Sequence, residues 1–288
     1  MAQAEAVVRP IVAVPANRWA RLRRAPTLLI GIALLAIIVV AAAAAPLLTP
    51  YSPSALDMRH TFEGPSRAHP LGTDNFGRDL FARLLYGARI DLMIGVFATL
   101  VTLIVGSGVG LLAGYYGGRL DRVIMRIVDI VVAFPFFVLV IGLVAMLGTG
   151  LRNMFVAIWL VGWISYARVV RGEVLFVRTR EYVEAARVIG MPDRTILVRH
   201  VLPNVITPAI VFSMTDVVLN ILLGSSLSFL GLGAQPPAPE WGLMIAEGRT
   251  FLATAWWMSA LPGLAIVITG VAFSLIGDGL ADVLRPGG

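Results

Sequence analysis

Long apolar runs dominate the chain and alternate with shorter polar segments. Four of these runs contain 19 to 22 residues and no charged side chain. At about 1.5 Å per residue, each is long enough as a helix to cross a hydrocarbon core of roughly 30 Å. Two further runs qualify, although one contains Arg168 near its end and the other contains Asp216 in its middle. The pattern predicts an all-α membrane protein with six transmembrane helices, at residues 27–48, 92–113, 130–148, 154–170, 205–223 and 257–276.

A polar segment, residues 49–91, separates the first two predicted spans and ends in HPLGTDNFGRDLFARLLYGARIDL. Asp74 is a residue type favoured at a helix N-cap. Four apolar residues follow at helical spacing: Leu80, Phe81, Leu84 and Leu85. We therefore expect a short amphipathic helix that lies along one face of the membrane. The histidines of this segment, His60 and His69, are more typical of ordinary surface residues than of a metal site.

Proline and glycine interrupt two other apolar segments. Pro135 lies inside the third predicted span and should bend it, because proline lacks the backbone N–H of the helical ladder. After the fifth span, SLSFLGLGAQPPAPEWG contains Gly231 and Gly233, which permit tight bends, and three prolines that stiffen the chain. Loose backbone exposed to lipid would leave its amides without partners, so this stretch predicts a re-entrant turn packed within the protein.

A charged segment, EYVEAARVIGMPDRTILVRHVLPN, lies between the fourth and fifth predicted spans. One helical face is apolar and small: Tyr182, Ala185, Ala186 and Ile189. Gly190 can end this helix, Met191 and Pro192 turn the chain, and Asp193 can cap a second helix at residues 194–201. The spacing therefore predicts a helical hairpin. A helix of about ten residues is marginal alone in water, so the hairpin needs another surface to pack against.

Charge indicates how the chain crosses the membrane. Only 14% of the residues are charged, and all 23 basic residues are arginine. Sixteen arginines fall on the side of the predicted hairpin and both termini, against seven on the other side. The positive-inside rule therefore places both termini and the hairpin in the cytoplasm. The basic residues indicate topology and not binding of nucleic acid, and the absence of cysteine excludes disulfides and cysteine metal sites.

A known motif runs through the hairpin. EAARVIG followed by LP resembles the EAA motif in the membrane subunits of bacterial ATP-binding-cassette (ABC) importers. The matching residues are Glu184, Ala185, Ala186, Gly190, Leu202 and Pro203. His200 replaces the isoleucine of the motif, and the ending RHVLPN is similar to the dipeptide and oligopeptide permease branch, as are HPLGTDNFGRDLFARLLYGAR, RIVDIVVAFP and SLSFLGLGAQPPAPEWG. Relatives often have a glutamate where this chain has Gly224, so no role of that carboxylate is carried over.

The resemblance implies the type I ABC importer fold. It implies a cytoplasmic tail at residues 1–26, a first span at 27–48 and an extracytoplasmic segment at 49–91. A five-helix permease core would follow at residues 92–283, with a coupling hairpin at 173–203 and a cytoplasmic end at 284–288. In this family the hairpin docks in a groove of an ATPase subunit. The residues expected to couple there are Glu184, Ala185, Ala186, Gly190, Met191 and Pro192.

The same resemblance implies the partners and the cargo. We expect a heterodimer with a second homologous permease, two ATPase subunits as separate or fused chains, and an extracytoplasmic substrate-binding protein, in the lipid of a bacterial inner membrane. ATP and Mg²⁺ would bind the ATPase partners, and this chain would hold no cofactor, metal or catalytic residue. Independently, a chain without lysine has no G-x4-G-K-[ST] phosphate loop. The expected cargo is a di- or oligopeptide; nickel chelates, glutathione and haem remain alternatives.

One polar stripe lies inside the fifth predicted span, formed by Ser213, Asp216 and Asn220. An aspartate at mid-bilayer costs about 2.5–3.5 kcal/mol, so the stripe should face protein or water. It either lines the translocation path or forms hydrogen bonds between helices, and the sequence leaves both open.

Two other protein classes compete with an ABC permease. An intramembrane protease would need H-E-x-x-H, an intramembrane histidine base or two facing aspartates, and the spans contain none of these sets. A proton-coupled secondary transporter could use Asp216, but it would leave the hairpin without a task.

Overall fold

The computed structural model describes residues 25–284. Apart from one isolated bridge between Thr73 and Asp79, regular structure in this part of the chain is helical. The helices are α2 Pro26–Ala43, α3 Ala45–Leu48, α4 Leu80–Tyr116, α5 Gly118–Val132, α6 Phe136–Leu147, α7 Leu151–Val177, α8 Glu181–Val188, α9 Asp193–Ile196, α10 Leu202–Phe229, α11 Trp241–Gly248 and α12 Trp257–Leu284. The arginine-bearing tail and Arg285 lie outside the described residues.

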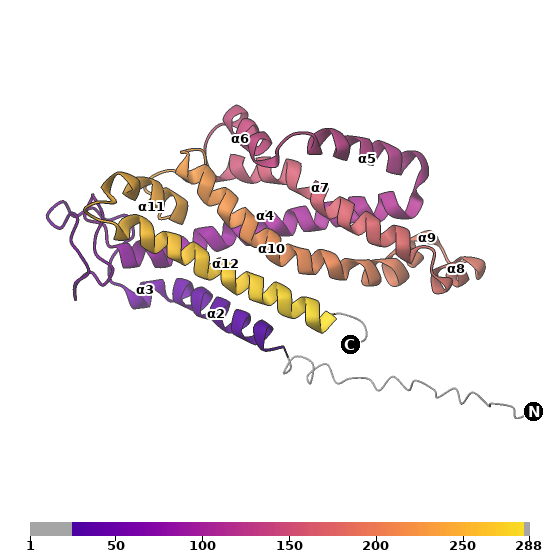
Figure 1. The fold of residues 1–288 in the computed structure, drawn as a ribbon, viewed down its shortest axis with the longest axis horizontal. Helices are drawn as coiled ribbons and strands as arrows, with labels where there is room; N and C mark the ends of the chain where they lie inside the picture. The colour runs from indigo at the N-terminus through magenta and orange to yellow at the C-terminus, as the bar shows by residue number, and fades with distance from the viewer. Residues whose placement is uncertain (1–24, 285–288) are drawn as a thin grey trace, which may run out of the picture.

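The long helices lie side by side along one axis (Figure 1). One end of this bundle carries α8 and α9, and we call it the hairpin end. The opposite end carries the long segment between α3 and α4 together with α11, and we call it the loop end. The start of α2 and the end of α12 both point toward the hairpin end.

Five helical segments are long and apolar enough to cross a membrane, and a bent pair of helices makes a sixth when it is counted as one span, as predicted. Five are single or continuous helical segments: Pro26–Ala43, Leu80–Tyr116, Leu151–Val177, Asp193–Phe229 and Trp257–Leu284. The sixth is the pair α5 and α6, which meet at an angle of 88°. This bend falls at residues 133–135 and confirms the expected effect of Pro135. The predicted all-α fold with six spans is therefore confirmed.

The expectation of a separate amphipathic helix before the second span is wrong. α4 begins at Leu80 and continues without a break through the whole second span to Tyr116. Its N-cap is Asp79, whose carboxylate accepts a hydrogen bond of 2.6 Å from the backbone N–H of Ala82, and not Asp74. Two charged residues in this first part of α4, Arg83 and Asp91, are buried.

α4 packs most extensively against α7, and glycine makes this close approach possible. A Cβ atom placed on Gly110 would lie 2.5 Å from the carbonyl oxygen of Ala167 on α7. Small residues at such positions let backbones of membrane helices come together and gain dispersion contacts. Elsewhere α12 packs against α2 and α10, so the first span joins the bundle mainly through the last one and also contacts α4.

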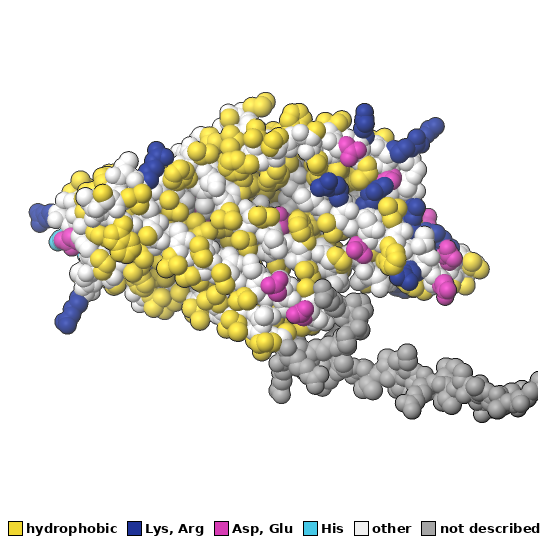
Figure 2. All heavy atoms as spheres, in the orientation of Figure 1, with side chains coloured by type: hydrophobic (Ala, Val, Ile, Leu, Met, Phe, Trp, Pro, Cys, Tyr) yellow, Lys and Arg dark blue, Asp and Glu magenta, His cyan; other side chains and the backbone are white. Residues whose placement is uncertain are grey.

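The surface of the bundle has the polarity of a membrane protein. Hydrophobic side chains cover its middle, whereas charged side chains gather at the hairpin end and, more sparsely, at the loop end (Figure 2). Side chains such as Ile37, Ile104 and Leu160 are more than half exposed in this band. An apolar surface of this extent is stable only against lipid or another protein.

Candidate coupling hairpin and translocation cavity

The hairpin forms where the sequence predicts it, but its second arm differs. Gly190 adopts a φ of 78°, which glycine tolerates, and turns the chain after α8. α9 then begins after Pro192, and its N-cap is this proline and not Asp193. The predicted second helix at 194–201 does not stop before Leu202. A π-helical turn at Leu197–Val201 joins α9 to α10, so the hairpin runs directly into the fifth span.

The two faces of α8 have different environments from those expected. Val183 and Ala186 are buried in one hydrophobic cluster with the chain's own residues from α4, α7, α9 and α10. Of the predicted apolar face, Tyr182, Ala185 and Ile189 are exposed, whereas Ala186 is buried within the chain. The tip of the hairpin presents large apolar side chains to solvent. Val188 is 86% exposed and Ile189 is 75% exposed.

Polar contacts tie the hairpin to the end of α4. The Tyr115 hydroxyl donates a hydrogen bond of 2.6 Å to the carboxylate of Asp193, and the guanidinium of Arg187 lies 5.1 Å from the centroid of the Tyr115 ring. Arg178, directly after α7, donates to the backbone carbonyl of Gly114 at 2.9 Å. Of the remaining predicted coupling residues, Glu184, Ala185, Gly190 and Pro192 are exposed and Met191 is half-buried. The hairpin therefore offers a free outer surface while its base is fixed to α4.

A cavity of about 400 Å³ lies among α6, α7 and α10. Asp216 and Asn220 line it, whereas Ser213 does not: the Ser213 hydroxyl is buried and donates to the carbonyl of Ile210 on its own helix at 2.7 Å. The wall of the cavity also includes three aromatic and two hydroxyl side chains: Phe136, Phe137, Phe212, Ser165 and Ser226. The structure thus brings two of the three predicted path residues to one cavity.

Asp216 forms hydrogen bonds between helices and also lines the cavity. Its carboxylate accepts hydrogen bonds from the Tyr166 hydroxyl on α7 at 2.9 Å and from the Asn220 amide at 3.2 Å. Asn220 also donates to the Thr99 hydroxyl on α4 at 2.9 Å. The aspartate therefore links helices and also reaches the cavity. Its remaining acceptor capacity is available to a group inside that cavity.

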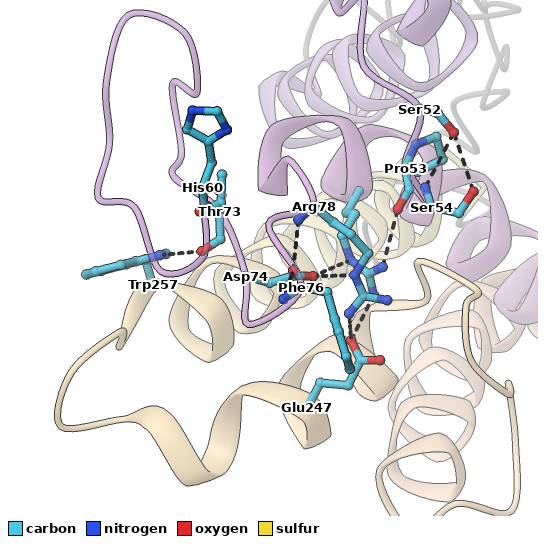
Figure 3. A network of polar contacts seen from close by, with 11 residues as sticks. Ser52, Pro53, Ser54, His60, Thr73, Asp74, Phe76, Arg78, Glu247 and Trp257 are labelled. Carbon is cyan, nitrogen blue, oxygen red and sulfur yellow. Dashed lines mark hydrogen bonds and ion pairs between the residues drawn. The ribbon is translucent and has the colours of Figure 1, made fainter. Parts of the chain in front are cut away.

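The loop end contains a buried network of charges that the sequence did not reveal (Figure 3). The Asp74 carboxylate accepts from the backbone N–H of Arg78 at 2.9 Å and from its Nε at 2.5 Å. Arg78 and Arg83 both donate to one oxygen of Glu247 on α11, at 2.7 and 2.9 Å. Both arginine side chains are almost fully buried, 3% and 1% exposed. These contacts fasten the loop between α3 and α4 onto α11.

α11 is held from its other side by two fully buried acids. The Glu240 carboxylate caps this helix and accepts from the backbone N–H groups of Gly242 and Leu243, at 2.9 and 2.7 Å. Asp91 on α4 accepts from the N–H of Trp241 at 3.1 Å. The expected re-entrant stretch is thus a packed segment in which buried polar groups have partners. Glutamate is not among the residue types favoured at an N-cap, so the sequence rules do not indicate this cap.

The two histidines of the loop end have different surroundings. His69 is buried and its Nδ1 lies 2.9 Å from the carboxylate of Asp79, so the expectation that it is a surface residue was wrong. His60 is exposed and its Nδ1 lies 2.8 Å from the carboxylate of Asp57. That hydrogen bond raises the pKa of His60 and lowers the pKa of Asp57. Across residues 25–284, no cluster of three or more side chains is suited to hold a metal ion.

A bundle of membrane-spanning helices, with an exposed hairpin at one end and a cavity that Asp216 and Asn220 line, is the architecture of a multi-pass membrane protein. The family model for "Binding-protein-dependent transport system inner membrane component" matches residues 106–287. A second model, "N-terminal TM domain of oligopeptide transport permease C", matches residues 16–65. The chain therefore belongs to the family of inner membrane components of binding-protein-dependent transport systems, and the resemblance to peptide-branch ABC permeases is confirmed.

Individual relatives extend over most of the chain. The chain is 48% identical over 224 residues to the glutathione transport system permease protein GsiD of Pectobacterium atrosepticum, covering 78% of this chain and 74% of that protein. It is 41% identical over 266 residues to the dipeptide transport system permease protein DppC of Alkalihalophilus pseudofirmus, covering 92% and 88%. A solved structure of the MetNI methionine ABC transporter, in inward-facing conformations, matches with a TM-score of 0.56 at 21% identity, over 70% of this chain and 97% of that chain.

Proposed function

We propose that this chain is one permease subunit of an ATP-driven importer for di- or oligopeptides and that it forms the translocation path with a second, homologous permease. The relatives named for dipeptide and glutathione transport support a cargo with a peptide backbone. Glutathione, nickel chelates and haem stay as alternative cargoes, because selection would rest with the extracytoplasmic binding protein. The observation that carries the proposal is the exposed hairpin tip above a base fixed to α4.

The hairpin would receive mechanical work from an ATPase subunit. Val188 and Ile189 would enter an apolar groove of that subunit, because their exposure to water is unfavourable. The continuous course from α9 through the π-helical turn into α10 makes a lever, since a displaced hairpin must move the start of α10. The hydrogen bond between Asp193 and Tyr115 would carry the same displacement to α4. Both helices contact the cavity or the residues that surround Asp216.

The arrangement of partners follows from what this chain lacks and from its charges. ATP and Mg²⁺ would bind two ATPase subunits, because a chain without lysine has no phosphate-binding P-loop. The positive-inside rule supports a cytoplasmic hairpin and cytoplasmic termini in a bacterial inner membrane. The loop end would then face outward and receive cargo from a substrate-binding protein.

Cargo would pass the cavity beside Asp216. A carboxylate on an otherwise largely apolar wall attracts an ammonium group, which every unmodified peptide carries at its N-terminus. Phe136, Phe137 and Phe212 supply surfaces for apolar side chains of varied shape. This cavity would form one wall of the translocation path, and the second permease would supply the other wall.

The decisive experiment places a charge on the hairpin tip. Ile189→Arg should abolish co-purification of the ATPase and reduce ATP-driven uptake of a labelled dipeptide at least tenfold, because a charge in an apolar groove is desolvated without a partner. The side chain is exposed, so the variant should fold normally. Leu56→Arg is the matched control, since Leu56 is 65% exposed in the loop-end segment.

Two results would contradict the proposal. The first is an Ile189→Arg transporter that retains its ATPase and its uptake. The second is uptake by the reconstituted chain that follows a proton gradient with every ATPase absent, which would identify a secondary transporter.

A further inference from the structure

The first half of α5 carries an arginine stripe that none of the contacts above uses. Arg119, Arg122 and Arg126 are exposed and line one shallow groove of about 430 Å³ together with Val123 and Ile127. These five positions follow helical spacing, so they form one continuous face of α5. We propose that this groove binds the phosphate headgroup of an anionic membrane lipid.

The stripe is basic although the exposed Asp129 lies three residues after Arg126 on the same helix, because three positive charges stand against this one negative charge. Asp121 lies on the opposite face of the helix, where its carboxylate is paired with the guanidinium of Arg171 on α7, with one N–O distance of 2.6 Å. Within residues 25–284, none of the three stripe arginines takes part in an ion pair. Their charges are therefore available to an external anion. Three guanidinium groups offer many N–H donors to phosphate oxygens.

The neighbouring apolar residues indicate a lipid and not a free anion. Val123 is 60% exposed, Ile127 is 48% exposed, and Ile130 continues the same face at 57% exposed. α5 begins at the hairpin end and runs toward the middle of the bundle, where the surface is apolar (Figures 1 and 2). Arg119 and Arg122 precede the apolar positions along the helix, and Arg126 lies between Val123 and Ile127. A headgroup beside the arginines would place its acyl chains along Val123, Ile127 and Ile130, as at a membrane interface.

The number of arginines sets the expected strength. Each arginine near an anionic lipid surface increases the equilibrium constant for binding that surface roughly fivefold. Loss of all three should therefore weaken retention of an anionic lipid by at least tenfold. An uncharged zwitterionic lipid should be retained poorly by either form of the protein.

Lipid retention can be measured without cargo or nucleotide, so its outcome is separate from that of the proposed function. The chain is purified from bacterial membranes with the subunits that accompany it. Phosphatidylglycerol or phosphatidylcholine is added, and bound lipid is counted by native mass spectrometry. The test variant is R119Q/R122Q/R126Q. The matched control is R59Q/R67Q/R152Q, which removes three exposed arginines from loop-end positions.

We expect the test variant to retain at least tenfold less bound phosphatidylglycerol than the wild type. The control variant and the charge-conserving R119K/R122K/R126K should stay within about threefold of wild type. A photo-crosslinker in place of Val123 should label phosphatidylglycerol in the assembled transporter. Equal retention by the test variant would overturn the proposal. Crosslinking of Val123 to a protein subunit, or release of the lipid by inorganic phosphate, would assign the groove to another occupant and would also overturn it.

Discussion

Neutralising Glu247 should loosen the loop end while leaving the bundle intact. Glu247→Gln keeps the shape of the side chain and one acceptor oxygen but removes the charge shared by Arg78 and Arg83. Asp74 retains its contact with Arg78, whereas its nearest oxygen lies 3.6 Å from Arg83 and is too far for a good hydrogen bond. Arg83 would therefore keep no charged hydrogen-bond partner in this network.

The size of the effect follows from two hydrogen bonds. Bonds to charged groups contribute about 1.5–3 kcal/mol and neutral ones about 0.5–1.5 kcal/mol. In Glu247→Gln both arginines stay charged and can still donate to the amide oxygen, but the bonds of 2.7 and 2.9 Å lose their charged acceptor, and one carboxylate instead of two balances the two buried guanidinium groups. This should cost roughly 2–3 kcal/mol in the free energy of local opening, less than the about 3–5 kcal/mol for a buried ion pair that loses one partner entirely. Since about 1.4 kcal/mol corresponds to a factor of ten, amides protected by the closed loop should exchange roughly 30- to 150-fold faster.

Hydrogen–deuterium exchange of the reconstituted protein measures this opening directly. The informative amides are those of Phe62 and Thr73, which donate across the loop to Asp74 and Glu63 at 3.1 and 2.9 Å. Amides of α7 serve as an internal reference and should not change. Asp57→Asn is the matched control, because its ion pair with His60 is exposed and solvent screens it. Loop amides that exchange within threefold of wild type in Glu247→Gln would refute this reasoning.

Two further changes test the cavity and the helix packing. Asp216→Asn keeps an acceptor for the Tyr166 hydroxyl but removes the negative charge. Dipeptide uptake should therefore fall about tenfold or more while subunit assembly is unchanged. Normal uptake by this variant would show that Asp216 does not act in the translocation path. Gly110→Ala should destabilise the protein by about 1–3 kcal/mol, read as a lower thermal midpoint in detergent, because its Cβ would meet the α7 backbone. Gly108→Ala, on the same helix with open space around it, should not destabilise, and equal losses from both would contradict the packing argument.

Sequence alone was sufficient for the features that depend on local physics. The apolar runs identified six spans because a segment's length and hydropathy decide whether it can cross a bilayer. Pro135 identified the bend in the third span for an equally local reason. The EAA residues located the hairpin, and Gly190 marked its turn. The family followed from motifs that are contiguous in the chain.

Other features required the tertiary structure, because they depend on residues distant in the sequence. Arg78 pairs with Glu247 across 169 positions, and no local pattern distinguishes this buried arginine from an exposed one. Ala186 faces inward because it joins a hydrophobic cluster with residues of α4, α7, α9 and α10, which helical periodicity cannot select. Asp216 reaches a cavity and also joins helices through Tyr166, which lies 50 positions earlier. Hydropathy is a property of a segment, whereas the environment of a charge is determined by which other segments surround it.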